Sequence, residues 1–122
     1  MEKLSQHEEE AMRIVYRVGE GNVKSFLDDM SEPKPPYTTL ASTIKNLEKK
    51  GFLKSRLVGN TYLYKPALPE GEYKKDYMSS IVKNYFANSY KDMVNFFVEQ
   101  KKLSPGELRE IAEMIEGKNN TN

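Results

Sequence analysis

One stretch of the sequence carries the residues best suited to contact a nucleic acid: PPYTTLASTIKNLEKKGF, from Pro35 to Phe52. Apolar residues recur in it at helical spacing, at Leu40, Ile44 and Leu47. The opposite face of such a helix presents polar side chains, namely Thr38, Thr39, Ser42, Lys45, Asn46 and Lys49. In the major groove of DNA, short hydroxyls allow close approach, an asparagine amide can pair with adenine, and lysines contact phosphates. The same face also suits a helix whose polar side simply meets water.

The charge of the chain is distributed unevenly, although the net charge is only +1. Between Pro36 and Pro66 there is a single acid, Glu48. The basic residues of this part are Lys45, Lys49, Lys50, Lys54, Arg56 and Lys65. A local basic surface attracts the phosphate backbone of a nucleic acid. The predicted phosphate contacts are Lys45, Lys49, Lys50, Arg56 and Lys65.

The first of the helices that must position this face is marked by a capping box, Ser5 followed three residues later by Glu8. It predicts a helix from about Ser5 to Arg17, with its apolar residues turned inward. We expect the adjacent acids Glu8, Glu9 and Glu10 to form a solvated face of this helix, because neighbouring helical residues diverge in direction.

Two further helices are expected before the spacing of apolar residues changes from that of a helix to that of a strand. Asn22 is suited to cap a short second helix. The third helix is predicted from about Tyr37 to Lys50, and Gly51 can take the left-handed conformation that ends it.

The segment FLKSRLVGNTYLYKPAL then alternates at the period of a strand. Gly59 and Asn60 tolerate the positive φ angles of a tight turn, so the segment predicts a β-hairpin. Three helices followed by a hairpin are the order of a winged helix-turn-helix. The fold class is therefore mainly α, with residues 1–69 as a winged-helix DNA-binding domain and residues 70–122 as a helical domain.

The helical domain has more large apolar residues than a chain of its length can enclose. A twofold dimer is the simplest way to bury them. Such a dimer also provides two DNA-binding domains, one for each of two half-sites. The residues expected in that interface are Met78, Ile81, Val82, Tyr85, Phe86, Val94, Phe97, Leu108, Ile111 and Ile115. Ser104 and Glu107 form a second capping box, and Gly117 is expected to stop the last helix.

Several other classes of protein are excluded or disfavoured. The chain has no cysteine, and its one histidine, His7, has Ala11 where a zinc-protease helix needs a second histidine. No glycine-rich phosphate loop occurs, so we expect neither an enzyme nor a cofactor. The segment MEKLSQHEEEAM lacks the apolar run of a secretory signal, and no stretch is apolar enough to span a bilayer. A cytoplasmic protein without direct membrane binding is expected.

The stretch YTTLASTIKNLEKKGFL, followed by YLYKP, resembles the recognition helix and wing of the penicillinase-repressor family. The resemblance runs from LSQHEEEAMRIVY through MVNFFVEQKKLSPGELREI. Members of the family are bacterial repressors of β-lactamase and methicillin-resistance genes. The resemblance implies a homodimer on a palindromic operator, with an N-terminal winged helix and a C-terminal helical dimerisation domain.

Residue by residue, the resemblance implies DNA contacts at Thr38, Thr39, Ser42 and Asn46. The better-known repressors have arginine where this chain has Ala41 and Asn46. Because arginine to guanine is the commonest specific contact, the missing arginines mean that the resemblance does not fix the operator sequence, although the implied mode of binding is unaffected. Copper-responsive relatives carry C-terminal cysteines, which this chain lacks.

The resemblance also implies a mode of release. In family members that respond to antibiotics, a membrane sensor metalloprotease cleaves an Asn-Phe bond in the dimerisation domain, and Asn95 and Phe96 occupy that position here. The competing interpretation is that Phe96 and Phe97 are core residues of a helix. Two other functions stay open: a winged-helix regulator released by a small ligand, and a winged helix used as a protein-interaction module. Tyr62 and Tyr64 could also stack on single-stranded bases.

Overall fold

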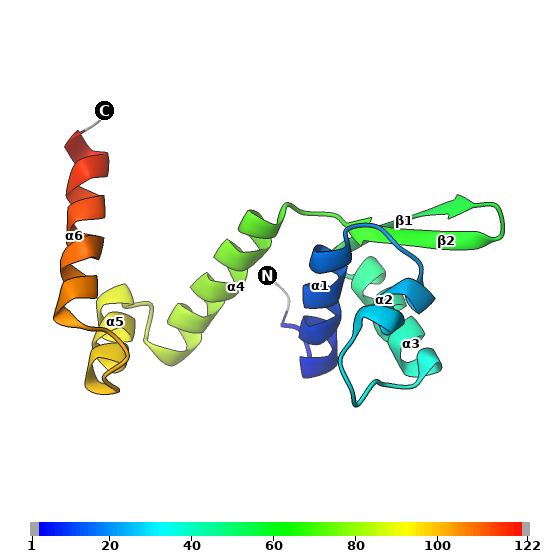
Figure 1. The fold of residues 1–122 in the computed structure, drawn as a ribbon, viewed down its shortest axis with the longest axis horizontal. Coiled ribbons are helices and arrows are strands. Elements are labelled where there is room, and N and C mark those ends of the chain that lie inside the picture. Colours follow the sequence, from blue (N-terminus) through cyan, green and yellow to red (C-terminus); the bar gives the residue numbers. More distant parts are fainter. Residues whose placement is uncertain (1–2, 121–122) are drawn as a thin grey trace. The chain divides into compact units, whose positions relative to one another are not determined.

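The structure is a computed structural model that describes residues 3–120, with side chains to residue 118. Its element order is helical except for one hairpin (Figure 1). The elements are α1 (Gln6–Val18), α2 (Val23–Asp29), α3 (Tyr37–Lys49), β1 (Leu53–Val58), β2 (Thr61–Pro66), α4 (Glu70–Tyr85), α5 (Tyr90–Glu99) and α6 (Pro105–Asn120). The expected mainly helical winged helix-turn-helix is confirmed.

The helix α1 begins where the capping box predicts. The Ser5 hydroxyl accepts a hydrogen bond from the Glu8 amide at 3.2 Å, and the Ser5 amide donates to the Glu8 carboxylate at 2.9 Å. Asn22 caps α2 in the same manner, since its side-chain oxygen accepts from the Ser25 amide at 2.8 Å. These bonds satisfy amides that have no partner within the helix.

The core of the winged helix lies between α1, α2, α3 and the base of the hairpin. Its fully buried side chains include Met12, Val15, Phe26, Ile44 and Leu47. The inward positions of α3 predicted from helical spacing are therefore confirmed as buried. Gly51, with φ of +88°, ends that helix as predicted.

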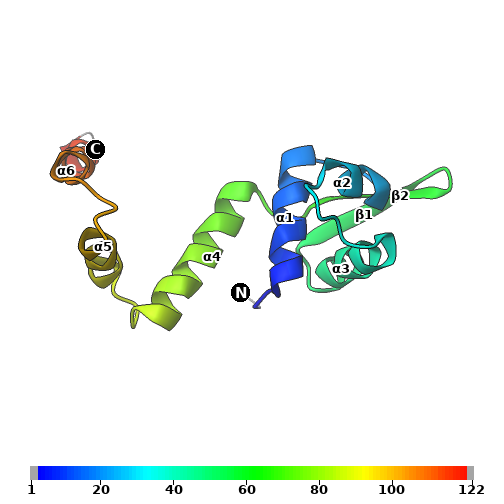
Figure 2. The ribbon, with the colours of Figure 1, turned by 60° about the horizontal axis from the view of Figure 1, so that its bottom comes forward.

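The hairpin pairs β1 with β2 from Leu53 opposite Pro66 to Val58 opposite Thr61. Gly59 takes a φ of +62°, whereas Asn60 is not among the residues with positive φ, so only the first turn residue needs the left-handed region. The connection between α1 and α2 adds a third short pairing: the Gly21 amide donates to the Tyr64 carbonyl at 3.0 Å, and the Tyr64 amide to the Gly21 carbonyl at 2.8 Å. In two views the strands run on past the helices as a wing (Figures 1 and 2).

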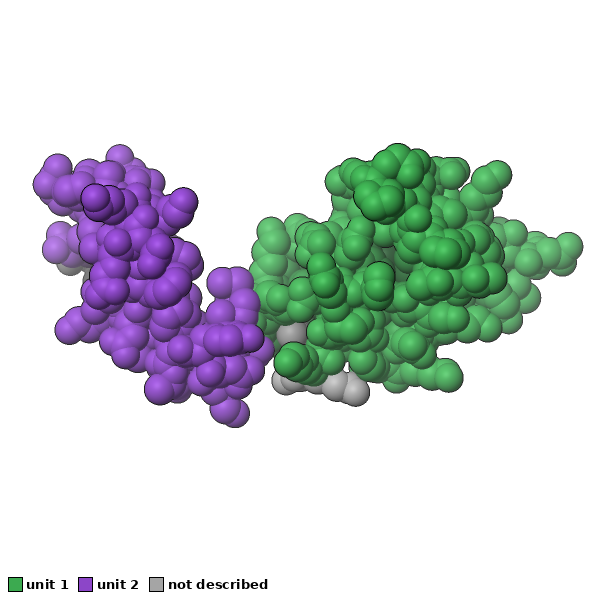
Figure 3. All heavy atoms as spheres, turned by 90° about the horizontal axis from the view of Figure 1, so that it is seen from below, with its two compact units in different colours: residues 1–77 green, residues 78–122 purple. Residues whose placement is uncertain are grey.

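The chain divides into two compact units, residues 1–77 and 78–122, coloured separately in Figure 3. The division falls inside α4, because the first turns of that helix pack on the first unit. Tyr73 is buried there, 5.4 Å from the Tyr16 ring and 6.2 Å from the Phe52 ring between centroids. The functional boundary at residues 69 and 70 stays a prediction.

The second unit continues α4 into α5 and α6. Ser104 and Glu107 form the predicted capping box, with both hydrogen bonds at 3.0 Å. The expectation that Gly117 stops the last helix is wrong, because α6 continues to Asn120. Among residues 3–120, no helix is both long enough and apolar enough to cross a membrane.

Candidate nucleic-acid interface

The polar face of α3 is turned outward along the whole helix. Its exposed residues are Tyr37, Thr38, Thr39, Ser42, Lys45, Asn46 and Lys49. Thr38, Ser42, Lys45 and Lys49 form its central ridge, opposite the buried Leu40, Ile44 and Leu47. The sequence-predicted contacts of this helix are therefore brought together on one accessible surface, with the exception of Lys50.

The first turn of α3 is left open. Its cap residue is Pro36, and within the described residues no side-chain capping hydrogen bond forms at this end of the helix. The Thr38 and Thr39 hydroxyls lie in the same turn. Open amides and the positive end of the helix dipole favour a negatively charged group at this end of the helix.

Lys50 has a different partner from the predicted one. Lys50 is the residue that caps the C-terminal end of α3, and its ammonium lies 2.9 Å from the Glu8 carboxylate of α1. Glu8 is only 6% exposed, so the prediction that it belongs to a solvated face is wrong for this residue. Burial raises the pKa of Glu8, but the hydrogen bonds from Ser5 and Lys50 outweigh it and hold that pKa below its ordinary value. The pair therefore fastens the end of α3 to the start of α1.

On the hairpin, Arg56 and Lys65 are exposed and project from the face that does not pack on α3. Arg56 holds Glu20 in a two-point pair, with Nη2 at 2.7 Å from one carboxylate oxygen and Nε at 3.0 Å from the other. The hydrogen bonds from Arg56 lower the pKa of Glu20. Because the pair is exposed to water, it contributes little to stability, and a phosphate can compete for the guanidinium.

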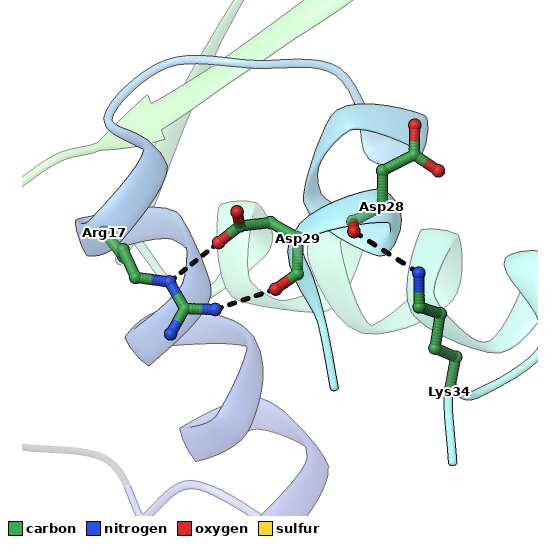
Figure 4. A network of polar contacts seen from close by, with 4 residues as sticks. All are labelled: Arg17, Asp28, Asp29 and Lys34. Atoms are coloured by element: carbon green, nitrogen blue, oxygen red, sulfur yellow. Dashed lines mark hydrogen bonds and ion pairs between the residues drawn. The ribbon is translucent and has the colours of Figure 1, made fainter. Parts of the chain in front are cut away.

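The connection that sets α2 against α3 is held by polar contacts at the end of α2 (Figure 4). Arg17 donates to the Asp29 carboxylate at 2.7 Å and to the Asp29 carbonyl at 2.8 Å. The Lys34 ammonium donates to the Asp28 carbonyl at 3.3 Å. These bonds tie α1 and the proline-rich loop to α2, and so help to fix the angle at which α3 is presented.

Two open grooves separate α3 from the wing. Of the residues that line them, sequence reasoning named Lys45, Lys49 and the two hairpin tyrosines as candidate contacts but missed Tyr37, Asn60 and Thr61. One is lined on the helix side by Tyr37, Ala41 and Lys45 and on the wing side by Asn60, Thr61 and Tyr62. Helical spacing could have placed Tyr37, Ala41 and Lys45 on one edge of the helix. It could not show that the wing lies across from them.

The two hairpin tyrosines have different surroundings although they share one face of β2. Tyr62 is 54% exposed, whereas Tyr64 is 5% exposed and packs in the core. Burial, with Glu48 as the next contribution, raises the pKa of Tyr64. Both tyrosines line the two grooves, but Tyr62 is by far the more accessible of the two.

In the second unit, most of the predicted interface residues are exposed or half-exposed. Met78, Tyr85, Val94, Phe97, Ile111 and Ile115 are exposed, and Ile81, Phe86 and Leu108 are half-buried. Val82 differs, because it is fully buried within its own chain and so supports the surface from beneath. Phe96 is 45% exposed and lies with Asn95 inside α5, 5.7 Å from the Phe86 ring.

A family model described as penicillinase repressor matches residues 4–117. The chain belongs to the penicillinase repressor family. It is thus a DNA-binding transcriptional repressor, in a family of repressors rather than of enzymes.

Individual relatives agree with this assignment. The chain is 24% identical over 115 residues to a penicillinase repressor of Bacillus licheniformis, covering 93% of this chain and 90% of that protein. It is 26% identical over 118 residues to an uncharacterized 16.5 kDa protein of Latilactobacillus sakei, covering 95% and 80%. Among solved structures, the DNA-binding domain of the repressor BlaI matches with a TM-score of 0.50 and 25% identity, over 60% of this chain and 94% of that domain. The penicillinase-repressor family resemblance read from the sequence is confirmed.

Proposed function

We propose that the repressor is a homodimer that occupies a palindromic operator, with α3 of each protomer in the major groove of one half-site. The observation that carries the proposal is the outward ridge of Thr38, Ser42, Lys45 and Lys49 on a winged helix of this family. Short hydroxyls near the open end of the helix suit close approach to bases and phosphates, and ammonium groups further along suit phosphates. The protein acts in the bacterial cytoplasm, where its operator lies.

The second unit supports the dimer. Exposed large apolar side chains recur along each of its helices, including Met78, Tyr85, Val94, Phe97 and Ile111. Apolar side chains repeated at this density mark an association surface. A twofold axis places two copies of α3 at a fixed separation, which is what a palindromic site requires.

The test is binding of the full-length protein to a duplex that the protein itself selects from a random-sequence library. We expect the affinity to fall steeply as salt rises, because lysines release counterions from the phosphates. The recovered sequence should show two inverted half-sites about one helical turn apart. A selection that recovers no common sequence, with no salt-dependent binding, would instead favour a protein-interaction module.

We further propose that release is by cleavage between Asn95 and Phe96 by a membrane sensor metalloprotease. Both residues lie in α5 with exposed side chains, and Phe96 with Phe97 belongs to the apolar surface of the second unit. A cut there would divide the association surface and so weaken the dimer on DNA.

Coexpression with the nearest sensor protease under induction tests this step, with the Asn95→Gln variant as the matched control. The proposal expects two fragments from the natural chain, identified by mass, and an intact variant. An intact natural chain would favour release by a small ligand. A gene for a membrane metalloprotease beside the repressor gene would support the cleavage route.

A further inference from the structure

A pocket of about 190 Å³ lies between α1 and the start of α4, outside the interface described above. Its walls include Glu9, Arg13 and Tyr16 from α1, and Tyr73 and Tyr77 from α4. On each helix these residues recur at three- or four-residue spacing, so one face of each helix lines the pocket. All of the lining residues fall within residues 1–77, so the pocket belongs to the first unit alone.

Three tyrosine rings form the apolar part of this pocket, and packing holds them in place. The Tyr73 ring lies 5.4 Å from the Tyr16 ring and 6.1 Å from the Tyr77 ring between centroids. The Tyr16 hydroxyl donates to the Leu68 carbonyl at 2.8 Å, and Phe52 lies edge-on against Tyr73. Such a cluster suits contact with a further aromatic ring. Because a dry cavity of about 150 Å³ can hold benzene, the pocket has room for one six-membered ring.

Two opposite charges lie one helical turn apart beside these rings. Neither Glu9 nor Arg13 belongs to an ion pair within residues 3–118. The other two charged lining residues, Glu70 and Lys74, lie 3.8 Å apart and are matched with each other. Burial raises the pKa of Tyr73 to about 12, with Glu9 adding to the rise and Arg13 opposing it. Both charges therefore lie near Tyr73 without a direct contact between them.

Side chains one helical turn apart have Cβ atoms about 5 to 6 Å apart, a spacing that the ammonium and the carboxylate of one amino acid can bridge. We propose that the pocket binds an α-amino acid with an aromatic side chain. The ligand ammonium pairs with Glu9, its carboxylate with Arg13, and its ring packs against the three tyrosines. A ligand with a single charge would leave Glu9 or Arg13 unmatched. The site is independent of the proposed function, because no lining residue lies on α3 or the wing.

The probe is L-phenylalanine, titrated into the full-length protein and followed by the amide chemical shifts of the protein. We expect a dissociation constant of roughly 0.1 to 1 mM, as for a ligand of this size, with shifts in α1 and the start of α4. Phenylpropanoate lacks the ammonium, phenethylamine lacks the carboxylate, and L-alanine lacks the ring. Each of the three should bind at least about 10-fold more weakly, because each loses one of the three contacts. Binding of phenylpropanoate or phenethylamine as tight as that of L-phenylalanine would overturn the proposal.

Two variants assign the charged contacts. Arg13→Gln should weaken L-phenylalanine at least about 10-fold without weakening phenethylamine, which has no carboxylate. Glu9→Gln should weaken L-phenylalanine to a similar extent without weakening phenylpropanoate, which has no ammonium. Glu10→Gln is the matched control, since Glu10 adjoins Glu9 but does not line the pocket, and it should bind like the natural protein.

Two results would overturn the proposal. One is a natural protein that does not bind L-phenylalanine at millimolar concentration. The other is binding that neither Arg13→Gln nor Glu9→Gln weakens. Both results would leave the proposed function intact, because that function is tested on duplex DNA without the amino acid.

Discussion

The two units of this repressor differ in the burial of their large apolar residues. In the first unit, Phe26, Met12 and Ile44 are fully buried by the chain itself. In the second, Phe97, Met114 and Ile115 remain exposed although they recur at helical spacing. The first unit therefore has a core of its own, whereas the second leaves many of its large apolar side chains exposed. A helix can have a regular apolar stripe in either case, so the stripe alone does not say what it packs against.

The largest expected effect is that of Phe26→Ala on the stability of the first unit, and it tests whether that unit has a core of its own. Phe26 is fully buried between the helices of the first unit, and truncation leaves a cavity there. We expect the free energy of unfolding of that unit to fall by about 3 to 5 kcal/mol. Urea unfolding followed by tyrosine fluorescence and circular dichroism measures it. The association of the second unit should survive at low urea, and its simultaneous loss would show that the two units do not behave separately.

Phe97→Glu should weaken association through the second unit without changing the stability of the first unit. The side chain is 41% exposed in the single chain, and a charge there would be buried without a partner in the dimer. We expect the association constant to fall at least about 30-fold, equivalent to roughly 2 kcal/mol. Sedimentation equilibrium measures this constant, with Lys91→Glu, a charge change at an exposed position in the same helix, as the control. An unchanged dimer would mean that the interface lies elsewhere.

Asn46→Ala and Lys49→Ala, both in the first unit, should weaken DNA binding in different ways without changing the dimer. Asn46→Ala should reduce discrimination between the selected duplex and a scrambled one by about 1 to 3 kcal/mol, because Asn46 is the residue predicted to contact a base. Lys49→Ala should weaken both duplexes alike and reduce the salt slope by about 1. Competition binding on the two duplexes separates these outcomes. A loss confined to the selected duplex for Lys49→Ala would contradict its assignment to phosphate.

Glu8→Gln tests a smaller effect, the fastening of α3 to α1. The pKa of Glu8 is lowered in the folded protein, so its contribution to stability is present above the ordinary carboxyl pKa of about 4.3 and is lost as pH falls through the folded value. At neutral pH we expect Glu8→Gln to cost about 1 to 2 kcal/mol. The difference from the natural protein should shrink as the pH is lowered below about 4, in urea unfolding at a series of pH values. A difference that is constant with pH would show that the ionised carboxylate is not what matters.

The elements whose ends depend on neighbours in the sequence were predicted well. The capping boxes at Ser5 and Ser104 form as expected, and α3 begins at Tyr37 as predicted. The extent of α6 was not predicted, because Gly117 only lowers helix propensity and does not by itself end a helix. In the candidate interface, the outward face of α3 followed from spacing alone. The groove across from it did not, since Asn60 and Thr61 come from a separate element.

By itself, the sequence determined the order of helices and hairpin, the caps, and which side of each helix is apolar, because these depend on side chains a few residues apart. Only the tertiary structure decided that Glu8 is buried against Lys50, that Tyr64 is buried while Tyr62 stays exposed, and that the chain divides inside α4. Each of those outcomes depends on residues brought together from distant parts of the chain. Their separation in space is fixed by how the elements pack, and no local pattern of residue types encodes it.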